Sequence, residues 1–371
     1  MKDMHGILFA HSSGANLKEL TEHRTASSLP FGARYRVVDF MLSGMVGAGV
    51  SDVGVIMREN YQSLLDHLGS GKDWDLSRKR GGLRLLPPFA YAGGRRDVSA
   101  YRGKLEALYA VMRYISYIRQ EYVVLADGDL IANLPLEEIF QKHLAKGADI
   151  TCVCAAGDFG GDSDIYIRPG AGEIASEVLL HCLDPDVYPG IGVYILSKAL
   201  LERLLADCAA HNYVDFARDV MQRLHGQLKI YTYLHDGFAT KIQSVSDYFA
   251  RSMSLLRHEI RRDLFNPNRP IKTKMRDDPP AYYSPESRVS KSIAADGCVL
   301  KGKVSNCIIF RGVHIDEGAV VSDCILMQDT RIEKGATLSH VICDKEVVVG
   351  SGKSLQGLKT YPVAISKGME I

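Results

Sequence analysis

A small polar turn at residues 11–16 is the part of the sequence best suited to contact a phosphate. It reads His-Ser-Ser-Gly-Ala-Asn and follows the apolar run Ile7–Ala10, which is typical of a buried strand in a parallel sheet. In α/β proteins, a strand that ends in a glycine-bearing turn leaves backbone N–H groups free to point at an anion. We therefore expect Gly14 to belong to a turn with the shape of a phosphate-binding loop.

A group of basic residues further along the chain offers a second place for an anion. The group consists of Arg78, Lys79, Arg80, Arg84, Arg95 and Arg96. Such a group is most often a solvated loop. The functional alternative is a site for an anionic effector, since guanidinium groups bind phosphates through paired N–H groups.

The elements that position these residues alternate between short apolar runs and helical patterns from residue 1 to 264. Strand candidates are Ile7–Ala10, Val53–Met57, Tyr122–Ala126, Ile150–Ala155, Val193–Leu196 and Lys229–Leu234. Apolar spacing predicts a helix over Lys104–Ile118. Pro135 suits the start of a helix over 135–146, and Ser197 suits the N-cap of a helix over 198–205. This alternation predicts an α/β domain with a mostly parallel sheet and helices on both faces.

The C-terminal part of the chain is organised differently. Residues 265–288 contain five prolines and many charges, which predicts an extended linker. Within 289–371 a pattern repeats with a period of 17 residues. Its equivalent positions are Ile308, Ile325 and Ile342; Ile315, Ile332 and Val349; and Gly318, Gly335 and Gly352. Aliphatic residues about every six positions with glycines between them predict a parallel β-helix, a fold that commonly takes part in oligomer contacts.

Composition excludes several classes of function. The 45 basic and 44 acidic residues give no electrostatic reason to expect nucleic acid or a membrane as the main partner. No run approaches the roughly 18 apolar residues of a membrane span, and the N-terminus lacks the apolar stretch of a signal peptide. The eight cysteines contain no CxxC pair, so we interpret them as buried thiols in a reducing cytoplasm.

Taken together, the motifs resemble those of the ADP-glucose pyrophosphorylase (glucose-1-phosphate adenylyltransferase) family, and most closely its GlgD-type subunits. The matching segments are 30–40 (PFGARYRVVDF), 101–103 (YRG), 128–129 (GD) and 215–219 (DFARD), followed by the β-helix repeats. The resemblance covers nearly the whole chain. It implies a Rossmann-like, GT-A-like nucleotidyltransferase domain over 1–264 and a left-handed β-helix over 289–371.

The resemblance also implies where a site would lie. Asp129 matches the family's first metal-binding aspartate and would supply a partial Mg²⁺ site. A nucleotide-like pocket would be formed by Gly14, Arg24, Arg36, Arg102, Gly103 and Asp129, and Asp215 would belong to a sugar-phosphate pocket. Each has a simpler alternative. Asp129 could hold a turn, Arg102 and Gly103 could shape a loop, and Asp215 with Asp219 could begin a helix.

The sequence departs from the family pattern at the positions that carry charge. Asn16 stands where the family has the arginine that faces the triphosphate, and Ala26 stands where it has a lysine. Lys241 replaces the second metal-binding aspartate, where it could bridge to Asp129 or lie on the surface. The segment that carries the family's sugar-phosphate lysine has no counterpart near 177–181. Mg²⁺ is therefore expected for the family but doubtful for this chain.

Three hypotheses follow from this comparison. The first is a modulatory GlgD-type subunit that assembles with a catalytic GlgC-type partner as a heterotetramer and retains weak binding of ATP, ADP-glucose or a phosphorylated effector. The second is an active Mg²⁺-dependent enzyme that makes ADP-glucose from ATP and glucose 1-phosphate. The third is a hexapeptide-repeat acyltransferase using His314 or His340, but it would leave the N-terminal domain without a role.

Overall fold

The computed structural model describes residues 3–10, 16–87, 101–160, 163–182, 184 and 186–371. The chain divides into two compact units. Unit 1 comprises 1–12, 38–241 and 264–272, and unit 2 comprises 13–37, 242–263 and 273–371. This division differs from the predicted domain boundaries, because segments 13–37 and 242–263 belong to the same unit as the β-helix.

Unit 1 is built on a nine-stranded sheet, counted over the described residues. Its strands are β1 (Met4–Phe9), β4 (Asp52–Ile56), β5 (Gly82–Leu86), β6 (Tyr122–Asp127), β8 (Ile150–Ala155), β9 (Tyr166–Pro169), β10 (Ala175–Leu179), β11 (Tyr188–Ser197) and β12 (Ile230–His235). The order is β10-β9-β11-β6-β1-β4-β5, and β8 lies between β11 and β12. Strands β5, β4, β1 and β6 are parallel, whereas β11 runs antiparallel to β6 and β8. A small separate sheet pairs β7 (Leu130–Ala132) with β13 (Ala239–Lys241).

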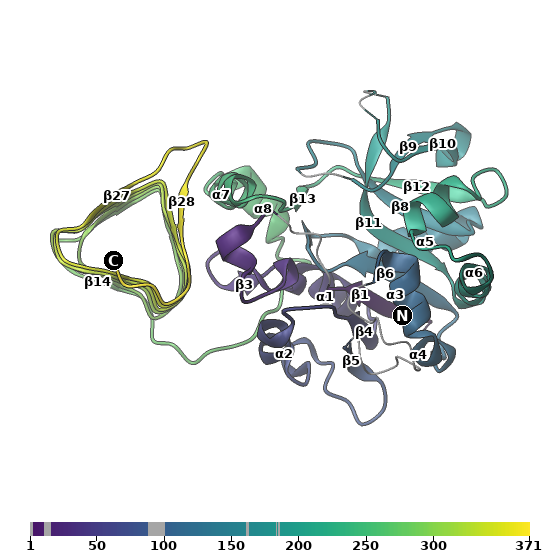
Figure 1. Ribbon diagram of the computed structural model, residues 1–371, viewed down its shortest axis with the longest axis horizontal. Helices are drawn as coiled ribbons and strands as arrows, with labels where there is room; N and C mark the ends of the chain where they lie inside the picture. Colours follow the sequence, from purple (N-terminus) through teal and green to yellow (C-terminus); the bar gives the residue numbers. More distant parts are fainter. Residues whose placement is uncertain (1–2, 11–15, 88–100, 161–162, 183, 185) are drawn as a thin grey trace. The chain divides into compact units, whose positions relative to one another are not determined.

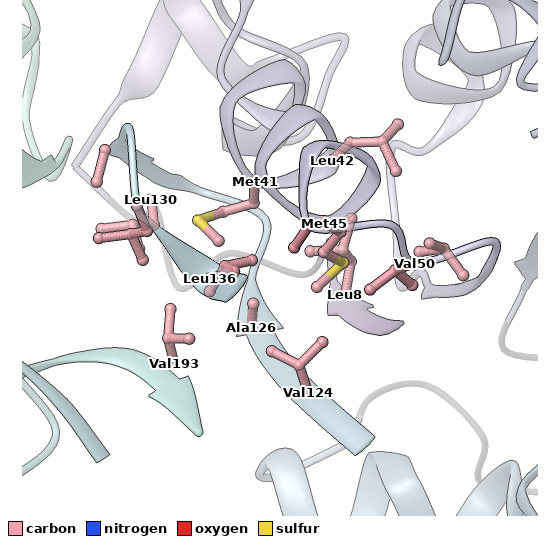
Figure 2. Close-up of a cluster of buried hydrophobic side chains, with 14 of the residues drawn as sticks. Leu8, Met41, Leu42, Met45, Val50, Val124, Ala126, Leu130, Leu136 and Val193 are labelled. Atoms are coloured by element: carbon pink, nitrogen blue, oxygen red, sulfur yellow. The ribbon is translucent and has the colours of Figure 1, made fainter. Parts of the chain in front are cut away.

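Alternate residues of β1 enter two different cores, one on each face of this sheet. Met4 and Leu8 pack with α1 (Val38–Gly47), α2 (Gln62–Leu68) and α5 (Leu136–Lys146), and part of this core is drawn in Figure 2. Ile7 and Phe9 pack with α3 (Lys104–Ala110), α4 (Met112–Ser116) and α6 (Lys198–His211). The period of two along a strand therefore produces the predicted three-layer arrangement.

The six predicted strands of unit 1 are confirmed, and Ile150–Ala155 has the predicted bounds. Ser197 is confirmed as an N-cap, since its Oγ accepts a hydrogen bond of 3.2 Å from the N–H of Leu200. The predicted helix over 104–118 is interrupted. Val111 has φ −103° and ψ 18° and separates α3 from α4.

Unit 2 contains the predicted parallel β-helix, whose triangular cross-section is seen end-on in Figure 1. Its first sheet stacks β14 (Tyr282–Tyr283), β17 (Val299–Leu300), β20 (His314–Ile315), β23 (Arg331–Ile332) and β26 (Val348–Val349). The second stacks β15 (Arg288–Ser290), β18 (Lys303–Ser305), β21 (Val320–Ser322), β24 (Thr337–Ser339) and β27 (Ser354–Gln356). The third stacks β16 (Ile293–Ala294), β19 (Ile308–Ile309), β22 (Ile325–Leu326), β25 (Val341–Cys343) and β28 (Val363–Ile365).

The 17-residue period is confirmed by the strand register. Ile308, Ile325 and Ile342 pair in succession, and all three are fully buried. Gly318, Gly335 and Gly352 occupy the corner between two sheets with φ of 70–72°, a conformation that favours glycine. The β-helix begins earlier than predicted, because β14 lies inside the segment that was interpreted as a linker.

Unit 2 also includes the hairpin of β2 (Pro30–Phe31) and β3 (Tyr35–Arg36), and the helices α7 (Val245–Ser254) and α8 (His258–Leu264). The eight cysteines are free thiols, seven of them buried, as their interpretation as small apolar residues predicts. No helix in the described part of the chain combines the length and the hydropathy that crossing a membrane requires.

Candidate functional site

Five charged side chains gather where the central strand β6 ends, and all belong to unit 1. Asp127 is the last residue of β6, and Asp129 follows in the turn to β7. Lys241 reaches the cluster because β13 pairs with β7 in a register that sets Lys241 opposite Leu130. Lys104, the first residue of α3, and Asp164 complete the group. Carboxyl ends of central strands are the usual location of ligand sites in α/β sheets.

The lysines bind directly to the aspartates. Lys241 Nζ lies 2.6 Å from Asp127 Oδ2, and Lys104 Nζ lies 2.9 Å from the same oxygen. Lys104 Nζ also lies 2.8 Å from Asp164 Oδ2. The side chain of Asp127 is only 6% exposed and that of Lys241 only 10% exposed. The contacts are therefore largely shielded from water, which strengthens them.

The two neighbouring aspartates respond to this environment in opposite ways. Burial pushes the pKa of Asp127 upward, but the ammonium groups of Lys104 and Lys241 outweigh it and hold that pKa below its ordinary value. Burial raises the pKa of Asp129 to about 6, with only partial compensation from Lys241. Asp127 is therefore firmly ionised, whereas Asp129 titrates close to neutral pH.

A glycine makes room for the ion pair. Gly192 of β11 has φ +81°, and a Cβ at this position would lie 2.0 Å from Asp127 Oδ2 and 3.0 Å from Lys241 Nζ. Any side chain here would collide with the bridge itself. The sequence thus contains a residue whose conformation and size both accommodate the Asp127–Lys241 contact.

The residues of this cluster do not fit a divalent metal ion. Two-metal or one-metal phosphoryl transfer needs oxygen ligands whose negative charge is free to bind the cation. Here Asp127 is neutralised by two ammonium groups, and the positive charges of Lys241 and Lys104 also act on Asp129, the aspartate that matches the family's metal ligand. Among the described residues, no three His, Cys, Asp or Glu side chains are arranged to hold a metal ion.

The predicted salt-bridge partner of Lys241 is wrong. We considered a salt bridge from Lys241 to Asp129, but the bridge is made to Asp127, two residues earlier. The simpler alternative of a surface lysine is also wrong, since Lys241 is buried. Asp127, Lys104 and Asp164 were missed by sequence reasoning. Two features of the sequence could have identified them: Asp127 ends an apolar strand, and Lys104 follows the YRG segment at the start of a helix.

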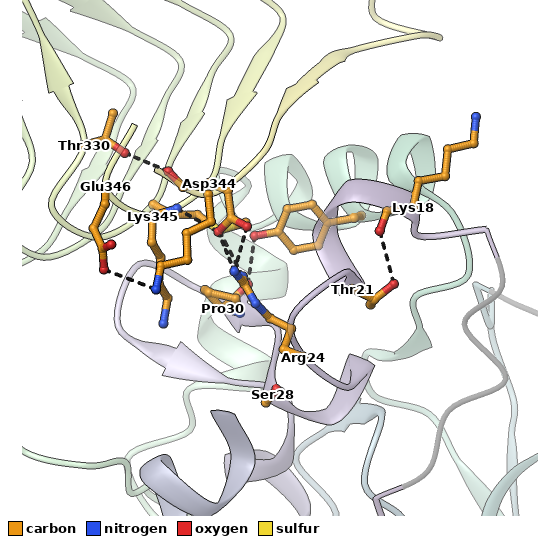
Figure 3. A network of polar contacts seen from close by, with 12 residues as sticks. Lys18, Thr21, Arg24, Ser28, Pro30, Thr330, Asp344, Lys345 and Glu346 are labelled. Atoms are coloured by element: carbon orange, nitrogen blue, oxygen red, sulfur yellow. Dashed lines mark hydrogen bonds and ion pairs between the residues drawn. The ribbon is translucent and has the colours of Figure 1, made fainter. Parts of the chain in front are cut away.

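Arg24, predicted for the nucleotide-like pocket, is engaged elsewhere. Its Nη2 lies 2.9 Å and 2.6 Å from the two carboxylate oxygens of Asp344 in the β-helix, as Figure 3 shows. Both side chains are buried, with exposed fractions of 4% and 1%. Tyr248 of α7 packs into the same network and donates a hydrogen bond of 2.8 Å to the carbonyl of Pro30. Within unit 2, Arg24 therefore fastens the 13–37 segment to the β-helix.

This ion pair leads to a prediction about stability. We expect Arg24→Met to destabilise the protein by about 3–5 kcal/mol, because it leaves the Asp344 carboxylate buried without a counter-charge. The double variant Arg24→Met with Asp344→Leu should recover most of the loss. Chemical unfolding, monitored by circular dichroism, measures the free energy of unfolding of the single and the double variant. A single variant that unfolds within about 1 kcal/mol of the parent would contradict the structural role.

The remaining predicted residues are mostly structural. Gly14 lies outside the described residues, and Asn16 pairs with Ser244 in an isolated bridge with its side chain exposed. Arg36 is half-buried in β3. Arg102 is exposed and pairs with Glu106 one helical turn away.

Two of the simpler alternatives gain direct support. A Cβ on Gly103 would lie 2.4 Å from the carbonyl oxygen of Val214, so this glycine permits a close approach of two backbone segments. Asp215 Oδ1 accepts a hydrogen bond from the N–H of Arg218, and Asp219 Oδ2 accepts two from the N–H groups of Val214 and Asp215. Both aspartates thus cap a helical turn.

Comparison with known proteins agrees with this architecture. Residues 5–161 match the nucleotidyl transferase family, and residues 279–357 match the GlmU-like C-terminal hexapeptide family. The chain is 33% identical over 366 residues to the glycogen biosynthesis protein GlgD of Bacillus subtilis, covering 99% of this chain and 96% of that protein. It is 36% identical over 319 residues to GlgD of Geobacillus stearothermophilus, covering 86% of this chain and 82% of that protein. It is also 32% identical over 324 residues to the glucose-1-phosphate adenylyltransferase of the same organism, covering 85% of this chain and 82% of that enzyme.

Proposed function

Because this chain belongs to the family of GlgD glycogen biosynthesis proteins and glucose-1-phosphate adenylyltransferases, we propose that it is a modulatory subunit in ADP-glucose synthesis for glycogen. Its own nucleotidyltransferase site is degenerate. It acts by assembling with a catalytic GlgC-type subunit in the cytoplasm, as a heterotetramer, and by biasing that subunit's conformation.

The observation that carries the proposal is the position of two ammonium groups on Asp127. Phosphoryl and nucleotidyl transfer depend on a divalent cation that bridges the substrate and neutralises the charge that develops on its oxygens. Lys104 and Lys241 bind Asp127, two residues before the aspartate that matches the family's metal ligand, at 2.9 Å and 2.6 Å. A fixed ammonium group repels the metal and cannot offer it the several oxygen ligands that it needs.

The loss of cations around the nucleotide supports the same conclusion. Asn16 carries no charge where a triphosphate would need an arginine. Arg24, the basic residue that the family pattern retains, has its guanidinium bound to both oxygens of Asp344. A ligand that recruited Arg24 would first have to break a buried ion pair. Any nucleotide held by this chain is therefore bound weakly.

The end of the β-helix offers a surface for a partner subunit. The loop between β27 and β28 exposes Leu358 and Tyr361, whose exposed fractions are 65% and 70%. Tyr282 and Tyr283 of β14, in the first coil and thus at the other end of the β-helix, are also about half exposed, at 53% and 49%. Large apolar side chains exposed on a solenoid are typical of contact surfaces with another chain.

Co-assembly tests the partner proposal. We expect this chain, mixed with a purified glucose-1-phosphate adenylyltransferase subunit from the same organism, to form a larger complex in size-exclusion chromatography with light scattering. Leu358→Asp with Tyr361→Asp should weaken that complex at least about tenfold, since it places charge on an apolar contact.

The matched control is Leu144→Asp on α5, an exposed leucine far from this loop in sequence. It should leave assembly unchanged. Two proteins that elute separately at every concentration tested would contradict the proposal of a hetero-oligomer.

A further inference from the structure

Four charged residues of the candidate site form a continuous chain of ion pairs, in the order Asp164, Lys104, Asp127 and Lys241. The contacts measure 2.8 Å from Asp164 Oδ2 to Lys104 Nζ, 2.9 Å from Lys104 Nζ to Asp127 Oδ2, and 2.6 Å from Asp127 Oδ2 to Lys241 Nζ. We call this chain the ionic lock. Each of its four residues comes from a different segment of unit 1, so the lock joins segments that are distant in sequence.

The ionic lock joins β6 to elements that are not its neighbours in the main sheet. β13 pairs with β7 in a separate two-stranded sheet, and the N–H of Lys241 donates a hydrogen bond of 2.9 Å to the carbonyl of Gly160. The start of α3 is bonded to Val214, whose carbonyl accepts hydrogen bonds from two N–H groups of the first turn. Through their side chains, Lys241 ties β13 and Lys104 ties the start of α3 directly to the end of β6.

The fourth residue, Asp164, extends the lock to the segment that leads into β9. The preceding residue fixes this segment, since Ser163 Oγ lies 2.6 Å from the carbonyl oxygen of Gly190 in β11. The side chain of Asp164 is 55% exposed, whereas those of the other three residues are 6–15% exposed. The lock therefore runs from the surface into the interior, where salt screens an ion pair much less than at the surface.

A purely stabilising role does not account for these buried charges. Replacing a buried ion pair by well-packed apolar side chains is often neutral or stabilising, because taking charges out of water costs free energy. Here both ammonium groups meet the same oxygen, Oδ2 of Asp127, and Gly192 keeps the space around that oxygen open. The contacts therefore define how the start of α3 and β13 lie relative to the end of β6.

The cations of the lock are part of the chain, which distinguishes it from a site that is held together by ligands. Where a metal ion or a nucleotide joins the parts of a site, the populated arrangement depends on the concentration of that ligand. The ammonium groups of Lys104 and Lys241 are tethered by their side chains, so they are present at every concentration of Mg²⁺ and nucleotide. The mismatch between this cluster and a divalent cation thus affects conformation as well as chemistry.

We infer that the ionic lock holds the start of α3, the end of β6 and β13 in one arrangement without a metal ion or a nucleotide, and that unit 1 keeps this arrangement at any concentration of either. A consequence for the partner rests on the proposed function. If the chain is a modulatory subunit, it imposes a constant conformational bias on the catalytic subunit, which ligands of its own site do not switch.

Hydrogen exchange, measured by mass spectrometry on the full chain, tests the lock. Lys241→Met should speed amide exchange in β7 and β13 at least about tenfold, because it cuts the tie between this small sheet and β6. Lys104→Met should speed exchange instead in the first turn of α3 and around Asp164. In the parent, addition of Mg²⁺ with ATP should change exchange in these segments by less than about twofold.

The matched control is Lys142→Met on α5, which removes the exposed pair with Glu138. It should change exchange in the same segments by less than about twofold. Where Lys241→Met does not fold, Lys241→Gln serves in its place. This milder variant should still speed exchange in β13 about three- to tenfold, and unchanged exchange would overturn the inference.

Mixing with a catalytic subunit separates the failure of the lock from the failure of the proposed function. Lys241→Met should still assemble with the catalytic subunit, but the change that it causes in that subunit's rate, substrate affinity or effector response should be at least about threefold smaller than with the parent. If the parent itself changes none of these properties, the proposed function fails, and hydrogen exchange alone decides on the lock.

Three results would overturn the inference. Lys241→Met could exchange as the Lys142→Met control does. Both lock variants could speed exchange evenly over unit 1, as general destabilisation would. Mg²⁺ with ATP could slow the parent's exchange in β13 or in the first turn of α3 at least about tenfold, which would show that ligands and not the lysines order these elements.

Discussion

Asp127→Asn is expected to destabilise the protein at neutral pH, whereas Asp129→Asn, two residues away, is expected to stabilise it. Asparagine at 127 would leave Lys241 buried without the carboxylate that it binds, and Lys104 with only the partly exposed Asp164. Breaking a buried pair in this way costs about 3–5 kcal/mol. Asparagine at 129 would remove a carboxylate that resists ionisation in its half-buried position. The same substitution should therefore have opposite effects at two nearly adjacent positions.

The pH dependence of the two effects follows from the direction of each pKa change. The folded pKa of Asp127 is lowered, so its contribution is present above the unfolded value of 3.8 and is lost as the pH falls through the folded value. The folded pKa of Asp129 is raised from 3.8 to about 6, so ionisation begins to oppose folding above pH 3.8 and does so fully above about pH 6. Two pKa units correspond to about 3 kcal/mol, which is the upper bound for the gain from Asp129→Asn.

Urea unfolding at pH 3.5 and pH 8 measures both variants against the parent. At pH 8 we expect Asp127→Asn to lower the free energy of unfolding and Asp129→Asn to raise it by about 1–3 kcal/mol. At pH 3.5 the stabilisation by Asp129→Asn should vanish. Lys142→Met is the control, because Lys142 forms an exposed pair with Glu138 and should change stability by less than about 1 kcal/mol. Stabilisation by Asp127→Asn, or destabilisation of equal size by both variants, would show that the charges are not arranged as described.

Much of the fold follows from local sequence pattern. Strands β1, β4, β6, β8, β11 and β12 are buried and rich in aliphatic residues, which makes them recognisable without structural information. The β-helix was predictable because stacked coils require equivalent residues at a fixed spacing. The edge strand β10 and its neighbour β9 were not predicted. They contain Arg168, Pro169 and Glu177 and have no continuous apolar run, since one side of each strand contacts solvent.

The assignment of segments to the compact units could not be predicted, because it depends on contacts that are distant in sequence. Arg24 lies 320 residues from Asp344, and no local pattern indicates that the two side chains meet. The hairpin of β2 and β3 reads as part of a nucleotidyltransferase domain. In the structure it belongs to the unit that holds the β-helix. The motif therefore identifies the protein family, but it does not predict which residues its side chains contact.

The candidate site was predictable in its chemistry but not in its pairing. Lysine at 241 in place of an aspartate indicated a charge reversal at a metal position. Which carboxylate it contacts depends on the register of β13 against β7, which places Lys241 beside Leu130. A strand end and the turn after it present Asp127 and Asp129 at different depths, and the more deeply buried Asp127 makes the bridge. Sequence alone does not determine such a register.

The second large effect concerns catalysis and follows from the same two lysines. Under the proposed function this chain has no metal clamp and no arginine at position 16, interactions that each stabilise a transition state by several kcal/mol. We expect its own turnover to be at most about 1% of that of a catalytic subunit of the family. We also expect it to change the behaviour of that subunit on assembly, because a modulatory subunit acts through coupling between chains.

Release of pyrophosphate from ATP and glucose 1-phosphate in the presence of Mg²⁺ is the most direct test of this account. It should be measured on this chain alone, on the catalytic subunit alone and on the two combined. The proposed modulatory role predicts almost no turnover by the lone chain and a change of at least about twofold in the partner's rate, substrate affinity or effector response on mixing. Turnover by the lone chain within about tenfold of the catalytic subunit would contradict it, as would mixing that leaves all three properties of the partner unchanged.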